Sequence, residues 1–152
     1  MMKELKITPI RNGTVIDHIK PGMALKVLKI LDISNESGKE VAIAMFTKSD
    51  KLGKKDLVKV EDMELRPRDV NKLAILTPNA TISIIRDFKV AKKFKVELPD
   101  QVEGIARCEN LNCITNQREP VLPRLIRISD DPPLYRCYYC GRQQSDVTSN
   151  II

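Results

Sequence analysis

Apolar and polar residues alternate in several short segments of the first hundred residues, and this spacing predicts strands. Residues 14–19 follow an Asn12-Gly13 turn signal, residues 56–61 alternate valines with charged side chains, and residues 81–88 are rich in isoleucine. Residues 40–47 are apolar on both faces, which predicts a central strand covered on both sides or a strand at a subunit contact. Residues 90–98 continue in an extended conformation.

Two segments with helical spacing interrupt these strands. The first follows Pro21-Gly22 and places its apolar residues on one face: Met23, Ala24, Val27, Leu28 and Leu31. The second extends from about residue 68 to 76, between Pro67 and the stop signal Pro78, and its inner face carries Val70, Leu73 and Ala74. The order strand, helix, strand, strand, helix, strand predicts a ferredoxin-like α+β domain, with two helices on one face of a four-stranded sheet.

The last third of the chain contains all four of its cysteines, as the close pairs Cys108/Cys113 and Cys137/Cys140. Each pair can close a short loop with both sulfurs pointing inward, and one tetrahedral divalent ion would then join the two loops. Two disulfides or four buried thiols are the alternatives. Disulfides are rare in the cytosol, and the chain shows no secretory signal and no transmembrane run, so we predict zinc in a cytoplasmic protein.

Four thiolates leave a zinc ion no open coordination position, so the predicted ion, one per chain, is structural. Gly141 is suited to the positive φ that follows a metal loop, and in the first loop we expect Asn110 or Asn112 to take that conformation. A unit of about fifty residues with few aromatic residues commonly needs such a metal. We place the boundary near Leu98-Pro99-Asp100, with a first domain at residues 1–99 and a small all-β, zinc-ribbon-like domain at residues 100–152.

The two predicted domains differ in charge. Residues 1–100 hold 20 Lys+Arg and 14 Asp+Glu, whereas residues 101–152 hold six of each, so the net charge of +6 lies in the first part. All six cations of the second part are arginines, a bias that favours a protein interface because guanidinium groups pair with carboxylates and desolvate at lower cost than ammonium groups.

Several cations, one aspartate and the single histidine fall at the ends of predicted strands. Asp17-His18 ends the first strand, Lys54-Lys55 and Lys59 lie before and on the third, and Lys92-Lys93 lie beyond the last. Such residues can surround an anionic, ribose-bearing ligand. A solvated lysine face and a hydrogen-bonded strand end are the usual explanation of such residues, so the residue types alone are a weak indication of a nucleotide site.

Five segments, in the same order almost from end to end, resemble the regulatory chain of aspartate carbamoyltransferase. Two are specific: the run GTVIDHI at residues 13–19 and the run GKKDLVKVE at residues 53–61. The others are Leu73-Ala74 with residues 78–81, and the two cysteine pairs.

The resemblance implies a chain without catalytic activity that controls pyrimidine biosynthesis. Its N-terminal domain would bind ATP or CTP, with UTP as a third candidate, and would form a homodimer, while its zinc domain would dock on the catalytic chain. The implied nucleotide contacts are Asp17 and Lys59 for the ribose and base, His18 and Lys93 for phosphates, Lys55 as a further phosphate contact, and the backbone around Ile10, Phe88 and Val90 for the base edge. The implied docking residues are Asn110, Asn112 and Arg142.

Two positions depart from the family pattern. Ser83 stands where the family often has asparagine, and Thr8 stands where it often has an acidic residue. Serine is too short for the same phosphate contact, and the loss of an acid beside the base could change nucleotide preference.

Two other function classes fit less well. A nucleic-acid adaptor needs cations on the zinc module, whose net charge is zero. An enzyme needs a nucleophile beside a base or paired carboxylates, and one histidine without a recognisable motif does not provide them. We therefore expect a regulatory subunit that binds neither nucleic acid nor membrane.

Overall fold

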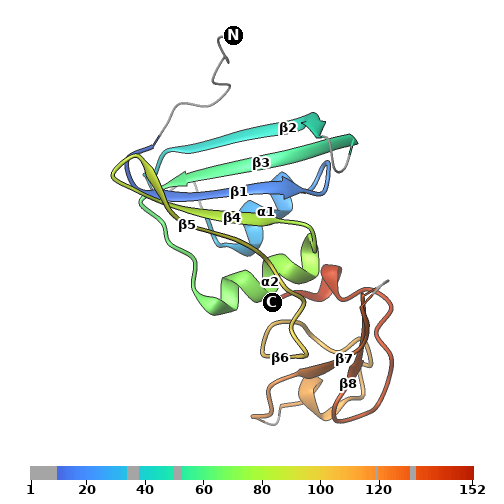
Figure 1. Ribbon diagram of the computed structural model, residues 1–152. Coiled ribbons are helices and arrows are strands. Elements are labelled where there is room, and N and C mark those ends of the chain that lie inside the picture. The colour runs from blue at the N-terminus through green and yellow to red at the C-terminus, as the bar shows by residue number, and fades with distance from the viewer. Residues whose placement is uncertain (1–9, 34–37, 50–52, 119, 131–132) are drawn as a thin grey trace. The chain divides into compact units, whose positions relative to one another are not determined.

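The computed structural model describes residues 10–33, 38–49, 53–118, 120–130 and 133–152 (Figure 1). Contacts divide the chain into two compact units. Unit 1 contains Met1–Arg66 and Asn79–Val96, and unit 2 contains Pro67–Pro78 and Glu97–Ile152. Thr8 lies outside the described residues. The expected boundary at residues 99 and 100 stays a prediction, because the contacts group the short segment 67–78 with the C-terminal residues.

Unit 1 is a five-stranded antiparallel sheet with the helix α1 (Ala24–Ile30) (Figure 1). The strands are β1 (Gly13–Ile19), β2 (Val41–Ser49), β3 (Gly53–Glu61), β4 (Thr81–Arg86) and β5 (Lys89–Lys95), in the order β2-β3-β1-β4-β5. The order β2-β3-β1-β4 is the split βαβ arrangement of a ferredoxin-like sheet, with β5 added beside β4. The α+β class is therefore confirmed.

The strand β2 lies at the edge of the sheet, so the expectation of a central strand was wrong for the single chain. Ile43, Met45 and Phe46 are exposed on it. An apolar edge strand and a central strand have the same residue pattern, because the pattern reports only that both faces carry apolar side chains. The alternative expectation, a strand at a subunit contact, stays a prediction.

The strands β4 and β5 form a hairpin that the sequence did not predict. Arg86 pairs with Lys89, and the two residues between them, Asp87 and Phe88, have positive φ values of 52° and 65°. Two positive φ values match a type I′ turn, which usually carries Asn-Gly or Asp-Gly. Because phenylalanine is an unusual residue in that conformation, the pair gave no turn signal and the strand seemed to continue to residue 88.

The buried carboxylate of Asp56 fixes the irregular parts of this sheet. Its Oδ2 accepts the backbone N–H groups of Gly22 at 2.9 Å and Ala24 at 3.0 Å, where α1 begins, and its Oδ1 accepts that of Phe46 at 2.9 Å. Phe46 and His18 each have a φ of 56° and lie where the pairing of β2 and of β1 with β3 shifts register. The Asp56 carboxylate therefore satisfies backbone groups at the β2 bulge and at the start of α1, whereas the His18 N–H at the β1 bulge is accepted by Asp17.

Gly13 opens β1 because no other residue fits there. Its φ is 151°, and a Cβ atom at this position would lie 2.2 Å from the carbonyl oxygen of Val60 on the neighbouring strand β3. The first glycine of the GTVIDHI run thus permits close approach of two strands.

Unit 2 combines one helix with a small antiparallel sheet. The helix α2 (Pro67–Leu76) belongs to this unit, and the sheet contains β6 (Gln101–Glu103), β7 (Arg124–Asp130) and β8 (Pro133–Cys137) in the order β6-β7-β8. Two short 3-10 helices, Ile114–Asn116 and Thr148–Asn150, complete it.

Within unit 2, Arg68 of α2 donates to the Gly104 carbonyl and Lys72 donates to the Ile152 carbonyl, each at 2.8 Å. Val70, expected on the inner face of α2, is only half-buried.

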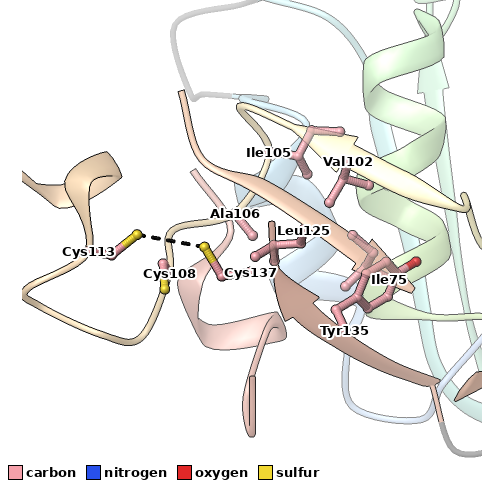
Figure 2. Packing of buried hydrophobic residues seen from close by; sticks show 9 residues of the cluster. All are labelled: Ile75, Val102, Ile105, Ala106, Cys108, Cys113, Leu125, Tyr135 and Cys137. Atoms are coloured by element: carbon pink, nitrogen blue, oxygen red, sulfur yellow. Dashed lines mark hydrogen bonds between the residues drawn. The ribbon is translucent and has the colours of Figure 1, made fainter. Parts of the chain in front are cut away.

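The core of unit 2 lies between this sheet and α2 (Figure 2). Its buried residues are Ile75, Val102, Ile105, Ala106, Cys108, Cys113, Leu125, Tyr135 and Cys137. The Tyr135 hydroxyl donates to the Pro99 carbonyl at 2.8 Å, and burial raises the pKa of Tyr135 to about 12. No helix among the described residues has the length and apolar character needed to cross a membrane.

Candidate metal centre and effector site

The four cysteine sulfurs meet at one point of unit 2. Cys108 and Cys113 come from the loop between β6 and β7, Cys137 ends β8, and Cys140 lies in the turn that follows. All four sulfur atoms lie within 4.8 Å of one another. The Sγ atoms of Cys108 and Cys140 are 3.7 Å apart, and those of Cys113 and Cys137 are 3.6 Å apart, as the dashed line in Figure 2 marks for the second pair.

These distances fit a metal centre and exclude disulfides. Bonded sulfurs are about 2.05 Å apart. A tetrahedron with zinc about 2.3 Å from each sulfur has edges of roughly 3.8 Å, close to both observed distances. Four thiolates in a tetrahedral arrangement are a donor set for zinc, and they leave no position for water or substrate. The four cysteines are thus a site for one structural zinc ion.

The two segments that carry the cysteines, residues 108–113 and 137–142, which we call the metal loops, form their turns in different ways. Gly141 has a φ of 75°, as predicted. Neither Asn110 nor Asn112 is among the described residues with positive φ, so that expectation was wrong. Instead, the Oδ1 atom of Asn110 accepts the N–H of Asn112 at 3.0 Å, and its backbone carbonyl accepts the N–H of Cys113 at 2.9 Å. A side-chain acceptor closes this turn without a left-handed residue.

The thiols of Cys108, Cys137 and Cys140 differ in acidity. Burial raises the pKa of Cys108 to about 12 and also raises the pKa of Cys137. Burial opposes the shift at exposed Cys140, but the backbone N–H of Arg142 and the side chain of Asn110 lower its pKa to about 7. Because a thiol must lose its proton to bind zinc, metal binding releases protons from Cys108 and Cys137, whose pKa values burial raises.

Three of the predicted effector residues of unit 1, Lys59, Ser83 and Lys93, lie on one face of the sheet. Strand register places Lys59 of β3 opposite Val15, Val15 opposite Ser83 of β4, and Ser83 opposite Lys93 of β5. Directly paired residues share a face, so these four residues, which we call the effector row, cross four strands side by side. Lys59 is only 7% exposed, and burial lowers its pKa while Glu40 opposes that shift.

Asp17, His18 and Lys55 lie together beside the effector row. The Oδ1 atom of Asp17 accepts the His18 backbone N–H at 2.7 Å and pairs with the Lys55 ammonium at 2.8 Å. Burial opposes the shift, but these two partners hold the pKa of Asp17 below its usual value. The Nδ1 atom of His18 is 3.1 Å from the Thr81 hydroxyl. The Asp17 carboxylate, the Lys55 ammonium and the His18 ring therefore lie close enough together to contact a single ligand.

The predicted base-edge residues lie near the opposite end of β1. Ile10 is buried against Gly13, at the start of that strand. The backbone N–H of Phe88 donates to the Arg11 carbonyl at 2.9 Å, and Val90 pairs with Ile85, which in turn pairs with Gly13. Phe88 and Val90 are 64% and 58% exposed, so their apolar side chains are open to a ligand. From Ile85 to Thr81 the strand rises about 14 Å, which separates this apolar end from the charged end.

The predicted docking residues all lie on the two metal loops. Asn110 is half-buried and its side chain is used within the loop, whereas Asn112 and Arg142 are exposed. Sequence reasoning missed Leu111 between the two asparagines, which is 82% exposed. A single leucine in a short polar metal loop has no core to pack into, and this pattern could have indicated a docking residue from the sequence.

Comparisons with known proteins agree with this geometry. The allosteric domain of the aspartate carbamoyltransferase regulatory chain matches residues 5–97, and the metal binding domain of the same chain matches residues 100–149. The chain belongs to this family. The regulatory chain of Methanothrix thermoacetophila is 53% identical over 92% of this chain and 91% of that relative. The regulatory chain of Pyrococcus abyssi is 50% identical over 99% of this chain and 100% of that relative.

Membership in the aspartate carbamoyltransferase regulatory family settles the broad role. The chain is a regulatory component of pyrimidine biosynthesis and is not itself catalytic, and a regulatory chain implies a catalytic-chain partner. The effector and docking roles of individual residues stay predictions.

Proposed function

We propose that this regulatory chain binds ATP and CTP, with UTP as a third candidate, at the effector row and at Asp17 and His18 beside it. The observation that carries the proposal is the register that places Lys59 and Lys93 on one sheet face, with Ser83 between them. The charged end supplies partners for phosphates and ribose hydroxyls, and the apolar end at Phe88 and Val90 supplies a surface for the base. ATP and CTP then compete for one site.

We further propose that the chain transmits this occupancy to the catalytic chain through unit 2. The helix α2 follows β3 in the sequence and precedes β4, so it is joined directly to the strands that carry Lys59 and Ser83. By its contacts α2 belongs to the unit that also holds the metal loops. The zinc ion would hold those loops in the shape that docks on the catalytic chain, through Asn112, Leu111 and Arg142.

The chain would form a homodimer through unit 1. Ile43, Met45 and Phe46 are exposed on the edge strand β2, and an uncovered apolar edge is a ready site for pairing with another strand. Four cysteines without a disulfide suit a reducing compartment, so we place the assembly in the cytoplasm. Sedimentation of the chain alone tests the dimer, and a monomer mass at micromolar concentration would contradict it.

Lys59→Ala tests the effector site. It removes a charge-assisted hydrogen bond of roughly 1.5 to 3 kcal/mol, so the affinity for ATP and CTP should fall about 10- to 150-fold in equilibrium dialysis. Assembly with catalytic chains should persist, because the metal loops are unchanged. The control is Lys48→Ala, an exposed lysine on β2 outside the effector row. Equal affinities for the two variants would mean that these lysines form only a solvated surface.

A further inference from the structure

The zinc site has polar neighbours that the cysteine pattern does not reveal. Gln144 is 2% exposed, and its Nε2 atom lies 3.5 Å from the Sγ atom of Cys108. The Thr115 hydroxyl lies 3.2 Å from the Sγ atom of Cys113. Each cysteine of the first pair thus has a side-chain donor directed at its sulfur.

The other contacts of Gln144 fix the direction of its amide. Its Oε1 atom accepts the backbone N–H of Glu109 at 2.8 Å, and its Nε2 atom donates to the carbonyl of Arg142 at 2.9 Å. An amide has one acceptor and two N–H donors. Because the acceptor and one donor are used by backbone groups of fixed polarity, the remaining N–H must point toward Cys108. In a flipped amide, the NH₂ group would face the N–H of Glu109 and the oxygen would face the carbonyl of Arg142.

The segment that carries Gln144 is also held in place. The Glu109 carboxylate accepts the Ser145 backbone N–H at 2.5 Å, the Ser145 hydroxyl at 2.6 Å and the Asp146 backbone N–H at 3.0 Å. The backbone N–H of Gln144 donates to the Tyr135 carbonyl at 2.8 Å. The amide is therefore held in place by contacts that do not involve the cysteine sulfurs.

Four thiolates and one zinc ion together carry about two net negative charges in a largely buried site. Donors to the sulfurs spread this charge, as outer-shell partners of metal ligands do. We propose that Gln144 and Thr115 are positioning residues of the metal centre, which slow the loss of zinc through hydrogen bonds to Cys108 and Cys113. The proposal rests on the structural zinc site described above.

Gln144→Met and Gln144→Glu test the role of the amide in the full-length, zinc-loaded chain. Both variants keep the side-chain length. Met removes the N–H donor to Cys108. Glu replaces that donor with a negatively charged oxygen and keeps an oxygen that accepts the backbone N–H of Glu109. Removal of an outer-shell partner typically costs about 10- to 100-fold in metal affinity, so zinc transfer to a coloured chelator should be faster by about that factor. The matched control is Gln143→Glu, the same charge change at the exposed neighbouring position, which should stay within about twofold of the parent.

Thr115 provides a second, milder pair of variants. Thr115→Val keeps the shape but removes the hydroxyl and should speed zinc transfer, whereas Thr115→Ser keeps the donor and should restore the parental rate. These half-buried substitutions keep the test decisive if a Gln144 variant fails to fold.

A cobalt-loaded chain separates an effect on the sulfurs from a general loss of stability. The sulfur-to-cobalt charge-transfer band should move in Gln144→Met and Thr115→Val, because the donors withdraw charge from the ligands, and should not move in Gln143→Glu or Thr115→Ser. Unchanged bands together with parental transfer rates in Gln144→Met and Thr115→Val would overturn the proposal, as would an equal change in Gln143→Glu. A parent chain with far less than one zinc would instead refute the metal site itself.

Discussion

The two units of this chain are stabilised in different ways. Unit 1 has a core of aliphatic side chains from its sheet and α1, and Ile16, Ile19, Val27, Val58 and Ile82 are all fully buried there. In unit 2, three of the nine buried residues of the core cluster are cysteines of the metal site. Burial of hydrocarbon can hold unit 1, whereas unit 2 has too small a core unless the metal joins its loops.

The chain supplies separate spectroscopic probes for the two units. Its three tyrosines, Tyr135, Tyr138 and Tyr139, all lie in unit 2, and it contains no tryptophan. Tyrosine fluorescence therefore reports unit 2 alone, while far-UV circular dichroism reports both units. The comparison can be tested on the intact chain.

The largest expected effect is the loss of unit 2 without its metal. Cys137→Ser removes a fully buried ligand from both the zinc site and the core, so the zinc content should fall from about one per chain to near zero. The tyrosine signal should become that of an unfolded segment, while the strand signal of unit 1 persists. Arg136→Lys, one residue earlier on β8 and exposed, should keep its zinc. A mutant that retains zinc would contradict the assignment, and loss of all strand signal would show that unit 1 depends on unit 2.

The same difference explains how much the sequence predicted. The cysteine spacing identified the metal site because few arrangements bring two such pairs to one ion. The order of strands and helices predicted four of the five strands of unit 1, β1 to β4, because hydrophobic spacing reports burial; the β4–β5 hairpin was not predicted. The grouping of α2 with unit 2 was missed, since an apolar helix face does not say which core it joins. The partners of Gln144 were missed too, because a glutamine 36 positions from Cys108 has no local pattern.

The second largest effect is expected at the buried carboxylate of Asp56 in unit 1, which accepts three backbone hydrogen bonds. In Asp56→Asn one oxygen becomes an NH₂ group that faces a backbone N–H donor, so at least one buried N–H loses its partner. Such losses cost about 1 to 3 kcal/mol each, more for a charged partner, so unit 1 should lose roughly 2 to 4 kcal/mol. Far-UV melting should show an earlier transition while tyrosine fluorescence stays unchanged. Asp32→Asn, an exposed position after α1 with a φ of 57°, should have little effect. Matching melts for the two variants would mean that Asp56 does not stabilise the β2 bulge or the start of α1.

A smaller effect is expected where unit 2 meets its partner. Leu111→Ser removes the most exposed large apolar side chain of the metal loops, and burial of a leucine is worth about 1.5 to 3 kcal/mol. Sedimentation of the variant with catalytic chains should show weaker assembly by about 10- to 150-fold, with zinc content and nucleotide affinity unchanged. Ile128→Ser, exposed on β7 away from the loops, is the matched control. If both variants assemble like the parent, the docking surface lies elsewhere.

The smallest expected effect is the acid dependence of the Asp17–Lys55 pair in unit 1. Burial opposes the shift, but Lys55 and the His18 N–H lower the pKa of Asp17 in the folded chain. A lowered folded pKa means that the folded state prefers the carboxylate. The stabilisation is therefore complete above the usual pKa of about 3.8 and is lost as the pH falls through the lowered folded value. The pair is partly exposed, so the contribution should stay under about 1 kcal/mol.

Denaturant unfolding of unit 1 should show Asp17→Asn less stable than the parent above about pH 4, with the difference closing at lower pH as the parental carboxylate is protonated. Asp87→Asn, in the exposed β4–β5 turn, should follow the parent at every pH. An Asp17→Asn difference that stayed constant across this range would assign the loss to the hydrogen bond to His18 and not to the charge.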